Sequence, residues 1–325
     1  MSDVKLARTI QRFKAKIDTG SYYEAHQTLR TIVNRYVKSN QFKEAIDLLY
    51  EGSLILIKNK QYASSSDLIT YLITVYEQFN ISPSEGDYKL KLIELINSLP
   101  SNETSLPDLA KQIIQWSRND IDKFGDNELH HVFGVKFLKA VQDEVEDDQL
   151  EISKEIKSED DRYKLFTIAE LHLILGTYNS VPLYVNYLYK WYEASSESDV
   201  DPGLFLSRAI INYGYLKNLK FIKDARDIFI TKLITKHTSY EESSRIYYYE
   251  KFPLLTFLQL LILTLEKENS TNKFLKLYDQ YKPLLKAYEI LPSIEYLGKV
   301  YFNVSLGSAN NQGNLLSSLM GDLFK

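Results

Sequence analysis

A twenty-residue repeat near the N-terminus limits the folds open to this chain more than any other feature. GSYYEAHQTL begins at residue 20, NQFKEAIDLL at residue 40 and KQYASSSDLI at residue 60. Each copy opens with a pair of turn-forming residues and has an aromatic residue at its third position: Tyr22, Phe42 and Tyr62. Ala25 and Ala45 follow three residues later. A large residue followed by a small one at this spacing predicts stacked helices that approach closely at the small residue.

Apolar residues recur at helical spacing along almost the whole chain. In DLITYLITVYEQF, one stripe comprises Leu68, Tyr71, Leu72, Val75, Tyr76 and Phe79. Turn signals interrupt this pattern at Gly20, Ser39–Asn40, Asn59–Lys60, Ser82–Pro83, Leu99–Pro100, Phe124–Gly125, Gly176, Pro202 and Asn218. Helices that fill the intervals between these signals and are joined by short turns pack antiparallel with their neighbours. The sequence therefore predicts an all-α fold, a right-handed α-solenoid of antiparallel helical hairpins similar to tetratricopeptide repeats.

We expect a single solenoid over residues 1–304, with an N-terminal half of about 1–142 and a C-terminal half of about 160–304. The acid-rich segment 143–161 predicts a solvated loop, an insertion or a frayed helix extension, and an electrostatic docking segment is the alternative. The final residues, 305–325, open with Gly, Asn and Ser and predict a flexible tail.

One stretch departs from the helical pattern. SRIYYYEKF, residues 244–252, places β-branched and aromatic residues together before a proline. It predicts a small β-hairpin or an extended loop between helices. An exposed strand edge there could accept another chain.

Composition excludes several classes of protein. The chain has no cysteine, which removes disulfides, thiolate nucleophiles and thiolate zinc sites. Its net charge of −4 argues against general nucleic-acid binding, whereas the basic residues 1–40 and the acidic residues 61–160 favour electrostatic steering of a partner. The N-terminus lacks the apolar segment of a secretory signal. The most apolar run, 252–265, is too short to span a membrane, so we expect a cytosolic protein.

Sequence motifs for catalysis are absent. The chain has no phosphate-binding glycine loop and no nucleophile elbow. His130 and His131 are adjacent but lack further ligands at zinc spacing, so we expect neither metal nor cofactor. Asp126 or Asn127 is expected to cap a helix, and His172 to be a hydrogen-bonded core or flanking histidine. These absences favour a non-enzymatic protein that binds other proteins through its solenoid surface.

Six stretches, in order along the chain, resemble one protein family. They are RFKAKIDTGSYYEAHQTLRTIVNRYVKS, SSDLITYLITVY, FGDNELHHVFG, LILGTYNSV, FPLLTFLQLLILT and LLSSLMGDLF. Together they resemble the factor-4 subunit of the pathway for guided entry of tail-anchored proteins, the GET pathway. The likeness extends over nearly the whole chain, and the segment 143–161 resembles an insertion relative to the family.

The resemblance implies a cytosolic, non-catalytic adaptor in the post-translational targeting of tail-anchored membrane proteins to the endoplasmic reticulum. Its N-terminal half would dock onto the homodimeric targeting ATPase, restrain ATP hydrolysis and so favour client loading. Its C-terminal half would hold the N-terminal segment of a ubiquitin-like-domain partner. The two contacts would bridge the ATPase to an upstream co-chaperone, without nucleic acid and without direct insertion into a membrane.

The resemblance also implies contact residues for the ATPase. Those carried over are Tyr22, His26, Arg35 and Lys38 on one helix, with Asp67 on another helix as the regulatory contact. Thr74 stands where the family can have an acidic residue, which argues against a second charged regulatory contact. Tyr22 and His26 lie at the edge of an apolar stripe, so a purely structural role is open for both.

Contact residues for the ubiquitin-like partner are expected in and after the predicted hairpin. The candidates are Tyr248, Phe252, Leu254, Phe257, Leu258 and Leu261. The helix that follows the hairpin is apolar nearly all round, so something must cover it. Later helices of the same chain could do so, and so could a helix of the partner, which the resemblance favours.

Two other classes of function are weighed against the adaptor. One is a helical-repeat scaffold subunit of another regulatory complex, against which the ordered family-like stretches count. The other is a hydrolase or transferase built on helices, against which the absent motifs count.

Overall fold

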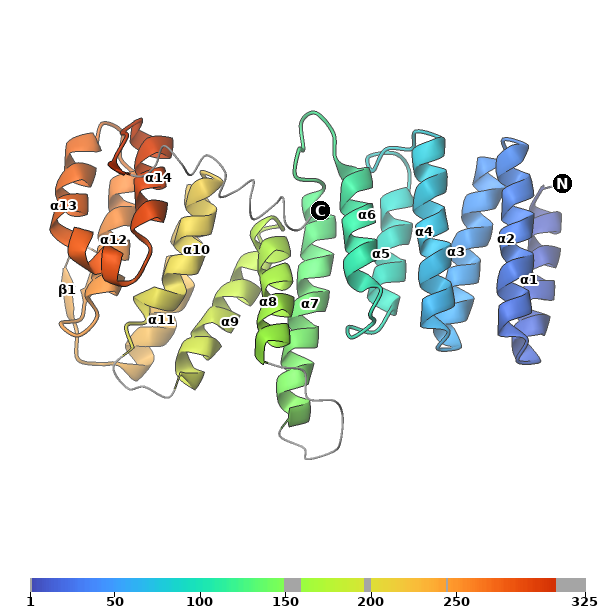
Figure 1. Ribbon diagram of the computed structural model, residues 1–325, viewed down its shortest axis with the longest axis horizontal. Helices are drawn as coiled ribbons and strands as arrows, with labels where there is room; N and C mark the ends of the chain where they lie inside the picture. The colour runs from blue at the N-terminus through green and yellow to red at the C-terminus, as the bar shows by residue number, and fades with distance from the viewer. Residues whose placement is uncertain (1, 149–158, 196–199, 244, 308–325) are drawn as a thin grey trace. The chain divides into compact units, whose positions relative to one another are not determined.

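The computed structural model describes residues 2–148, 159–195, 200–243 and 245–307 (Figure 1). Within these residues there are fourteen α-helices and one two-stranded sheet, which confirms the predicted all-α solenoid. Every turn predicted from the sequence falls between helices. The chain forms two compact units, Met1–Gly176 and Thr177–Lys325.

The first four helices explain the twenty-residue repeat. They are α1 (Ser2–Asp18), α2 (Tyr22–Lys38), α3 (Phe42–Lys58) and α4 (Tyr62–Gln78), each of 17 residues. A residue with positive φ follows each of them: Gly20, Asn40, Lys60 and Asn80. After α2, the N–H of Gln41 donates to the carbonyl of Tyr36 at 2.9 Å, and the equivalent bond recurs after the other three helices. This Schellman turn provides hydrogen-bond donors for the last carbonyls of each helix. The chain therefore reverses direction after the same number of residues each time.

The helices of the first unit pack in two layers. Figure 1 shows these helices following one another in chain order along the unit. Contacts join α1, α3, α5 (Tyr88–Ser98) and α7 (Asn127–Asp148) in one layer, and α2, α4 and α6 (Leu106–Ser117) in the other. Ala25 and Ala45 are fully buried between helices, as the repeat predicts. The packing around Gly52 on α3 is equally tight, because a Cβ there would lie 2.4 Å from Leu29 Cδ1. The small residues therefore set how closely the hairpins stack.

One helix is buried more widely than its predicted stripe. On α4, Ile69 and Ile73 are buried together with four members of the stripe, Leu68, Leu72, Val75 and Tyr76, while Tyr71 and Phe79 are half-buried. The reason is that α4 packs against α3 in the opposite layer and against both α2 and α6 in its own layer.

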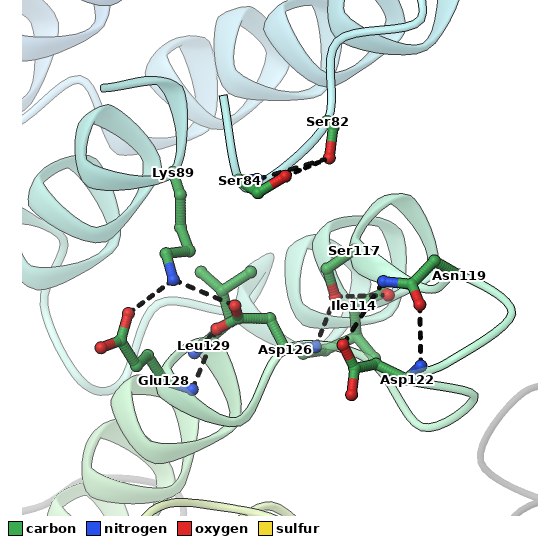
Figure 2. Close-up of polar contacts among 10 residues, drawn as sticks. All are labelled: Ser82, Ser84, Lys89, Ile114, Ser117, Asn119, Asp122, Asp126, Glu128 and Leu129. Atoms are coloured by element: carbon green, nitrogen blue, oxygen red, sulfur yellow. Dashed lines mark hydrogen bonds and ion pairs between the residues drawn. The ribbon is translucent and has the colours of Figure 1, made fainter. Parts of the chain in front are cut away.

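The last two helices of the first unit are α7 (Asn127–Asp148) and α8 (Glu159–Ile174). Asp126 caps α7, as one of the two alternatives predicts, because its Oδ1 accepts from the N–H groups of Glu128 and Leu129 at 2.9 and 3.1 Å. Lys89 on α5 approaches Asp126 at 3.0 Å and Glu128 at 2.6 Å (Figure 2). These two carboxylates therefore fasten α7 to α5.

Both ends of the predicted acidic segment 143–161 are helical. Helix α7 continues to Asp148 and α8 begins at Glu159. Residues 149–158 lie outside the described part of the chain.

The second unit contains α9 (Ser180–Ala194), α10 (Gly203–Tyr215), α11 (Leu219–Lys236), β1 (Glu241–Ser243), β2 (Ile246–Tyr248), α12 (Pro253–Leu265), α13 (Thr271–Ala287) and α14 (Leu291–Phe302). The strands pair antiparallel, with Ser243 opposite Ile246. The hairpin thus spans 241–248 rather than 244–252. Its first strand, Glu-Glu-Ser, lacks the β-branched and aromatic residues on which the prediction depended.

The described chain ends at residue 307, so nearly all of the predicted tail 305–325 lies outside it. No helix within the described ranges combines the length and the apolar character that crossing a membrane requires.

Candidate partner-binding sites

Two of the residues predicted to contact the ATPase meet in the structure. His26 on α2 and Asp67 on α4 are 41 positions apart in the sequence, and their Nε2 and Oδ2 atoms lie 2.8 Å apart. Because a carboxylate only accepts hydrogen bonds, the imidazole Nε2–H is the donor. His26 is 8% exposed, whereas the Asp67 side chain is 40% exposed. The Asp67 carboxylate is therefore held by a buried histidine and remains partly exposed to solvent.

Arg30 completes this cluster. It lies one helical turn after His26, and its Nη1 contacts both carboxylate oxygens of Asp67. The guanidinium carbon lies 5.4 Å from the centre of the Tyr71 ring, one turn after Asp67 on α4. We call His26, Arg30, Asp67 and Tyr71 the α2–α4 cluster. It joins two neighbouring helices of one layer through a charge-assisted contact and a cation–π contact.

The other residues carried over from the family lie elsewhere on α2. Tyr22 is half-buried, in keeping with the structural alternative, while Arg35 and Lys38 are exposed near the helix end. Neither of these cations forms an ion pair with a residue that the structure describes. Arg35 comes nine residues after His26, which places it about 180° round the helix. A partner that contacts both His26 and Arg35 must therefore cover the solvent-facing side of α2.

Two residues on α2 were missed as candidates. Tyr23 is 76% exposed and lies between the α2–α4 cluster and Lys38 around the helix. Arg30 could have been found from its spacing, four residues after His26 on the same edge. Thr74, where the family can be acidic, is exposed and donates to the carbonyl of Thr70 at 3.0 Å, so it adds no charge to this surface.

The candidates for the ubiquitin-like partner divide by burial. Tyr248 is 45% exposed. The other five are at most 4% exposed: Phe252, Leu254, Phe257, Leu258 and Leu261. Helices α10, α11 and α13 and strand β2 all contact α12. This chain itself thus covers the apolar helix, and in this conformation these five side chains form core rather than surface.

The β-hairpin is fixed to α12 by one glutamine. Gln259 Oε1 accepts from the N–H of Tyr247 and its Nε2 donates to the carbonyl of Tyr247, both at 2.9 Å. The amide therefore pairs with the outer edge of β2 as a neighbouring strand would. Beside this contact lies a groove of about 410 Å³, lined by Arg226, Asp227, Ile230, Thr231, Ile234, Glu242, Arg245, Tyr247 and Gln259.

His172 is a hydrogen-bonded core histidine, as predicted. Its Nδ1 lies 2.9 Å from Nδ1 of His130, and both side chains are at most 4% exposed. His130 Nε2 is 3.0 Å from the carbonyl oxygen of Phe124, which can only accept, so this nitrogen carries the proton. The two rings connect α7 to α8 in the interior and lie apart from the α2–α4 cluster.

The fold defines the class of protein as an α-helical solenoid of stacked hairpins. Comparison with known proteins then gives the family. The chain belongs to the GET4 family, Golgi to ER traffic protein 4, whose model matches residues 39–324. This confirms the resemblance and assigns the chain to the GET pathway of protein transport.

Individual relatives agree over almost the full length. The Golgi to ER traffic protein 4 of Aspergillus fumigatus is 30% identical over 98% of this chain and 90% of its own length. That of Schizosaccharomyces pombe is 28% identical over 93% of this chain and 90% of its own length. The crystal structure of C. therm. Get4 superposes with a TM-score of 0.78 at 26% identity, covering 99% of this chain and 96% of its own. The relatives are named as traffic proteins. The family model begins at residue 39, so the candidates on α2 precede it.

Proposed function

We propose that this protein is a non-catalytic cytosolic adaptor that bridges the targeting ATPase for tail-anchored proteins to a ubiquitin-like-domain partner. The ATPase docks on α2 through Tyr22, His26, Arg35 and Lys38 and contacts Asp67 on α4. The adaptor restrains its ATP hydrolysis so that client loading is favoured. The ubiquitin-like protein binds the second unit through its N-terminal segment and connects the assembly to a co-chaperone.

One observation carries this proposal: His26 and Asp67, carried over from separate stretches of sequence, meet at 2.8 Å on a partly exposed edge of a GET4-family chain. The exposed Arg35 and Lys38 on the same helix leave two cations available for an acidic partner. In the second unit, the exposed Tyr248 and the groove beside the hairpin support a docking place for the ubiquitin-like partner.

Co-purification tests the proposal directly. The full chain is immobilised and presented separately with the ATPase in its ATP-bound form and with the ubiquitin-like protein. We expect each to be retained, and all three to elute as one complex in size-exclusion chromatography. If neither protein is retained, the adaptor function is wrong and a scaffold role in another complex takes its place.

Reversing the two exposed cations of α2 is expected to weaken ATPase binding. Arg35→Glu with Lys38→Glu replaces attraction by repulsion towards an acidic partner, and association should slow about tenfold at low salt. The difference should shrink as the salt concentration rises, because screening reduces both effects. Stopped-flow association rates at several salt concentrations measure this.

The control for that experiment is Lys273→Glu with Lys276→Glu. These lysines are also exposed and three residues apart on one helix, but they lie on α13 in the second unit. Equal slowing by both pairs would show that net charge, rather than the α2 face, determines the rate.

Removing the Asp67 carboxylate is expected to relieve the restraint on ATP hydrolysis. In Asp67→Ala the fold should survive, because a partly exposed ion pair contributes at most about 1 kcal/mol. The ATPase should therefore still bind this variant but hydrolyse ATP faster than with the parent adaptor. Steady-state phosphate release at saturating adaptor measures the rate, and equal rates with the two adaptors would remove the regulatory role of Asp67.

A further inference from the structure

The carboxylate of Asp67 is held by more than the histidine carried over from the family. Arg30 Nη1 contacts both of its oxygens, while His26 Nε2 contacts Oδ2 alone. The side chains of Arg30 and Asp67 are each 40% exposed, so their contact lies at the surface where α2 and α4 meet. The orientation of the Asp67 carboxylate is therefore determined by two residues of α2, His26 and Arg30.

Tyr71 packs against the guanidinium of Arg30. The Arg30 guanidinium lies over its ring at 5.4 Å, and burial raises the pKa of the Tyr71 hydroxyl above its usual value while the charge of Arg30 opposes this. A planar guanidinium can stack on a ring and donate to a carboxylate at the same time, which an ammonium group does less well. Arg30 is thus held in place on one side and holds Asp67 on the other.

We propose that Arg30 is the positioning residue for Asp67 in the regulatory contact with the ATPase. This inference rests on the proposed function. Arg30 fixes the rotamer of Asp67, so that the exposed side of the carboxylate faces the partner in one orientation when the complex forms. Its effect on ATP hydrolysis passes through Asp67 and not through a contact of its own.

Arg30→Gln separates positioning from binding. With this variant we expect the ATPase rate at saturating adaptor to rise by the same factor as with Asp67→Ala. The adaptor concentration that gives half of the effect should stay unchanged, because Arg35 and Lys38 are intact. Arg30→Lys should restore part of the restraint, since it keeps the charge but not the two-sided geometry.

A double-mutant cycle shows whether Arg30 acts through Asp67. In the Asp67→Asn background, Arg30→Gln should not change the hydrolysis rate further. Lys43→Gln is the matched control, because it removes one positive charge from an exposed position on the adjacent helix α3. It should behave like the parent.

Three results would overturn the inference. Full restraint by Arg30→Gln would show that Asp67 needs no positioning, and additive effects in the cycle would show that Arg30 acts independently. A lowered melting temperature together with a shifted half-saturation would show that Arg30 is merely structural. If the parent adaptor neither binds the ATPase nor changes its rate, the proposed function fails first and this inference fails with it.

Discussion

Replacing Asp201 by alanine is expected to destabilise the second unit by roughly 3–6 kcal/mol, because three buried N–H groups lose their acceptor at once. Asp201 is 2% exposed. Its Oδ1 accepts from the N–H groups of Gly203 and Leu255 at 2.8 and 3.2 Å, and its Oδ2 accepts from Leu254 N–H at 2.7 Å. Gly203 begins α10, and the two leucines lie in the first turn of α12.

One carboxylate thus caps two helices that are about fifty residues apart along the chain, and its charge complements both helix N-termini. The packing there leaves no room for adjustment, since a Cβ on Gly203 would lie 2.5 Å from the backbone nitrogen of Leu255. Water cannot easily replace the missing oxygens, so the cost of unsatisfied donors should appear in full.

Hydrogen exchange measured by mass spectrometry locates this effect. Burial raises the pKa of the Asp201 carboxyl to about 6, opposed by its three backbone donors, so the measurement belongs at pH 7.5 where the group is ionised. Peptides from α10 and α12 should lose protection in Asp201→Ala, whereas those from α2 and α4 should not. Asp279→Ala, an exposed acid on α13, is the control and should stay within about 0.5 kcal/mol of the parent. Unchanged protection of α10 and α12 would show that the double cap contributes little.

The sequence predicts the architecture well where local chemistry repeats. The aromatic-to-alanine spacing and the turn residues follow from short-range geometry, so the first four helices and their boundaries are readable without a structure. The hairpin is predicted only in part, because β1 is held by pairing with β2 and by no preference of its own residues. The double cap by Asp201 escapes prediction altogether, because nothing local links Asp201 to Leu254.

At the candidate sites, too, the exposure of single residues can be predicted from the sequence, but contacts between helices cannot. Arg35 and Lys38 are exposed, as their helical positions predict. The contact between His26 and Asp67 depends on how α2 and α4 pack, and the resemblance alone brings the two residues together as candidates. For α12, the apolar sequence correctly indicates that something must cover the helix, but only tertiary structure shows that this chain does so. Five of the six candidates there would have to leave the core before a partner could contact them.

Acidification is expected to destabilise the first unit through the buried pair His130–His172. His130 Nε2 donates to Phe124, so in the neutral ring its Nδ1 must accept from His172 Nδ1–H. Protonation of His130 at Nδ1 would place two N–H groups face to face, and protonation of His172 at Nε2 would place a charge in the interior. Burial lowers the pKa of His130 to about 4, with the charge of Arg118 adding to this and that of Asp126 opposing it. Burial also lowers the pKa of His172 well below its usual value, with the neighbouring His130 adding to this.

The sign of the pH effect follows from these directions. Below about pH 6.5 the unfolded chain binds protons at both histidines, while the folded chain binds them only at much lower pH. The stability contributed by the pair is therefore complete above pH 6.5 and is lost as the pH falls towards 4. Between pH 7 and pH 5 the loss should be about 2 kcal/mol for His130, with a further loss for His172.

Tryptophan fluorescence can follow this unit alone, because Trp116 lies in α6 and Trp191, the other tryptophan, lies in the second unit. Urea unfolding of a Trp191→Phe variant at pH 7 and pH 5 gives the two free energies of unfolding. In His130→Gln with His172→Leu the buried titrating groups are gone, so the difference between the two pH values should shrink even if the variant is less stable at both. A parent protein with equal stability at pH 7 and pH 5 would mean that water reaches the pair and that its protonation costs little.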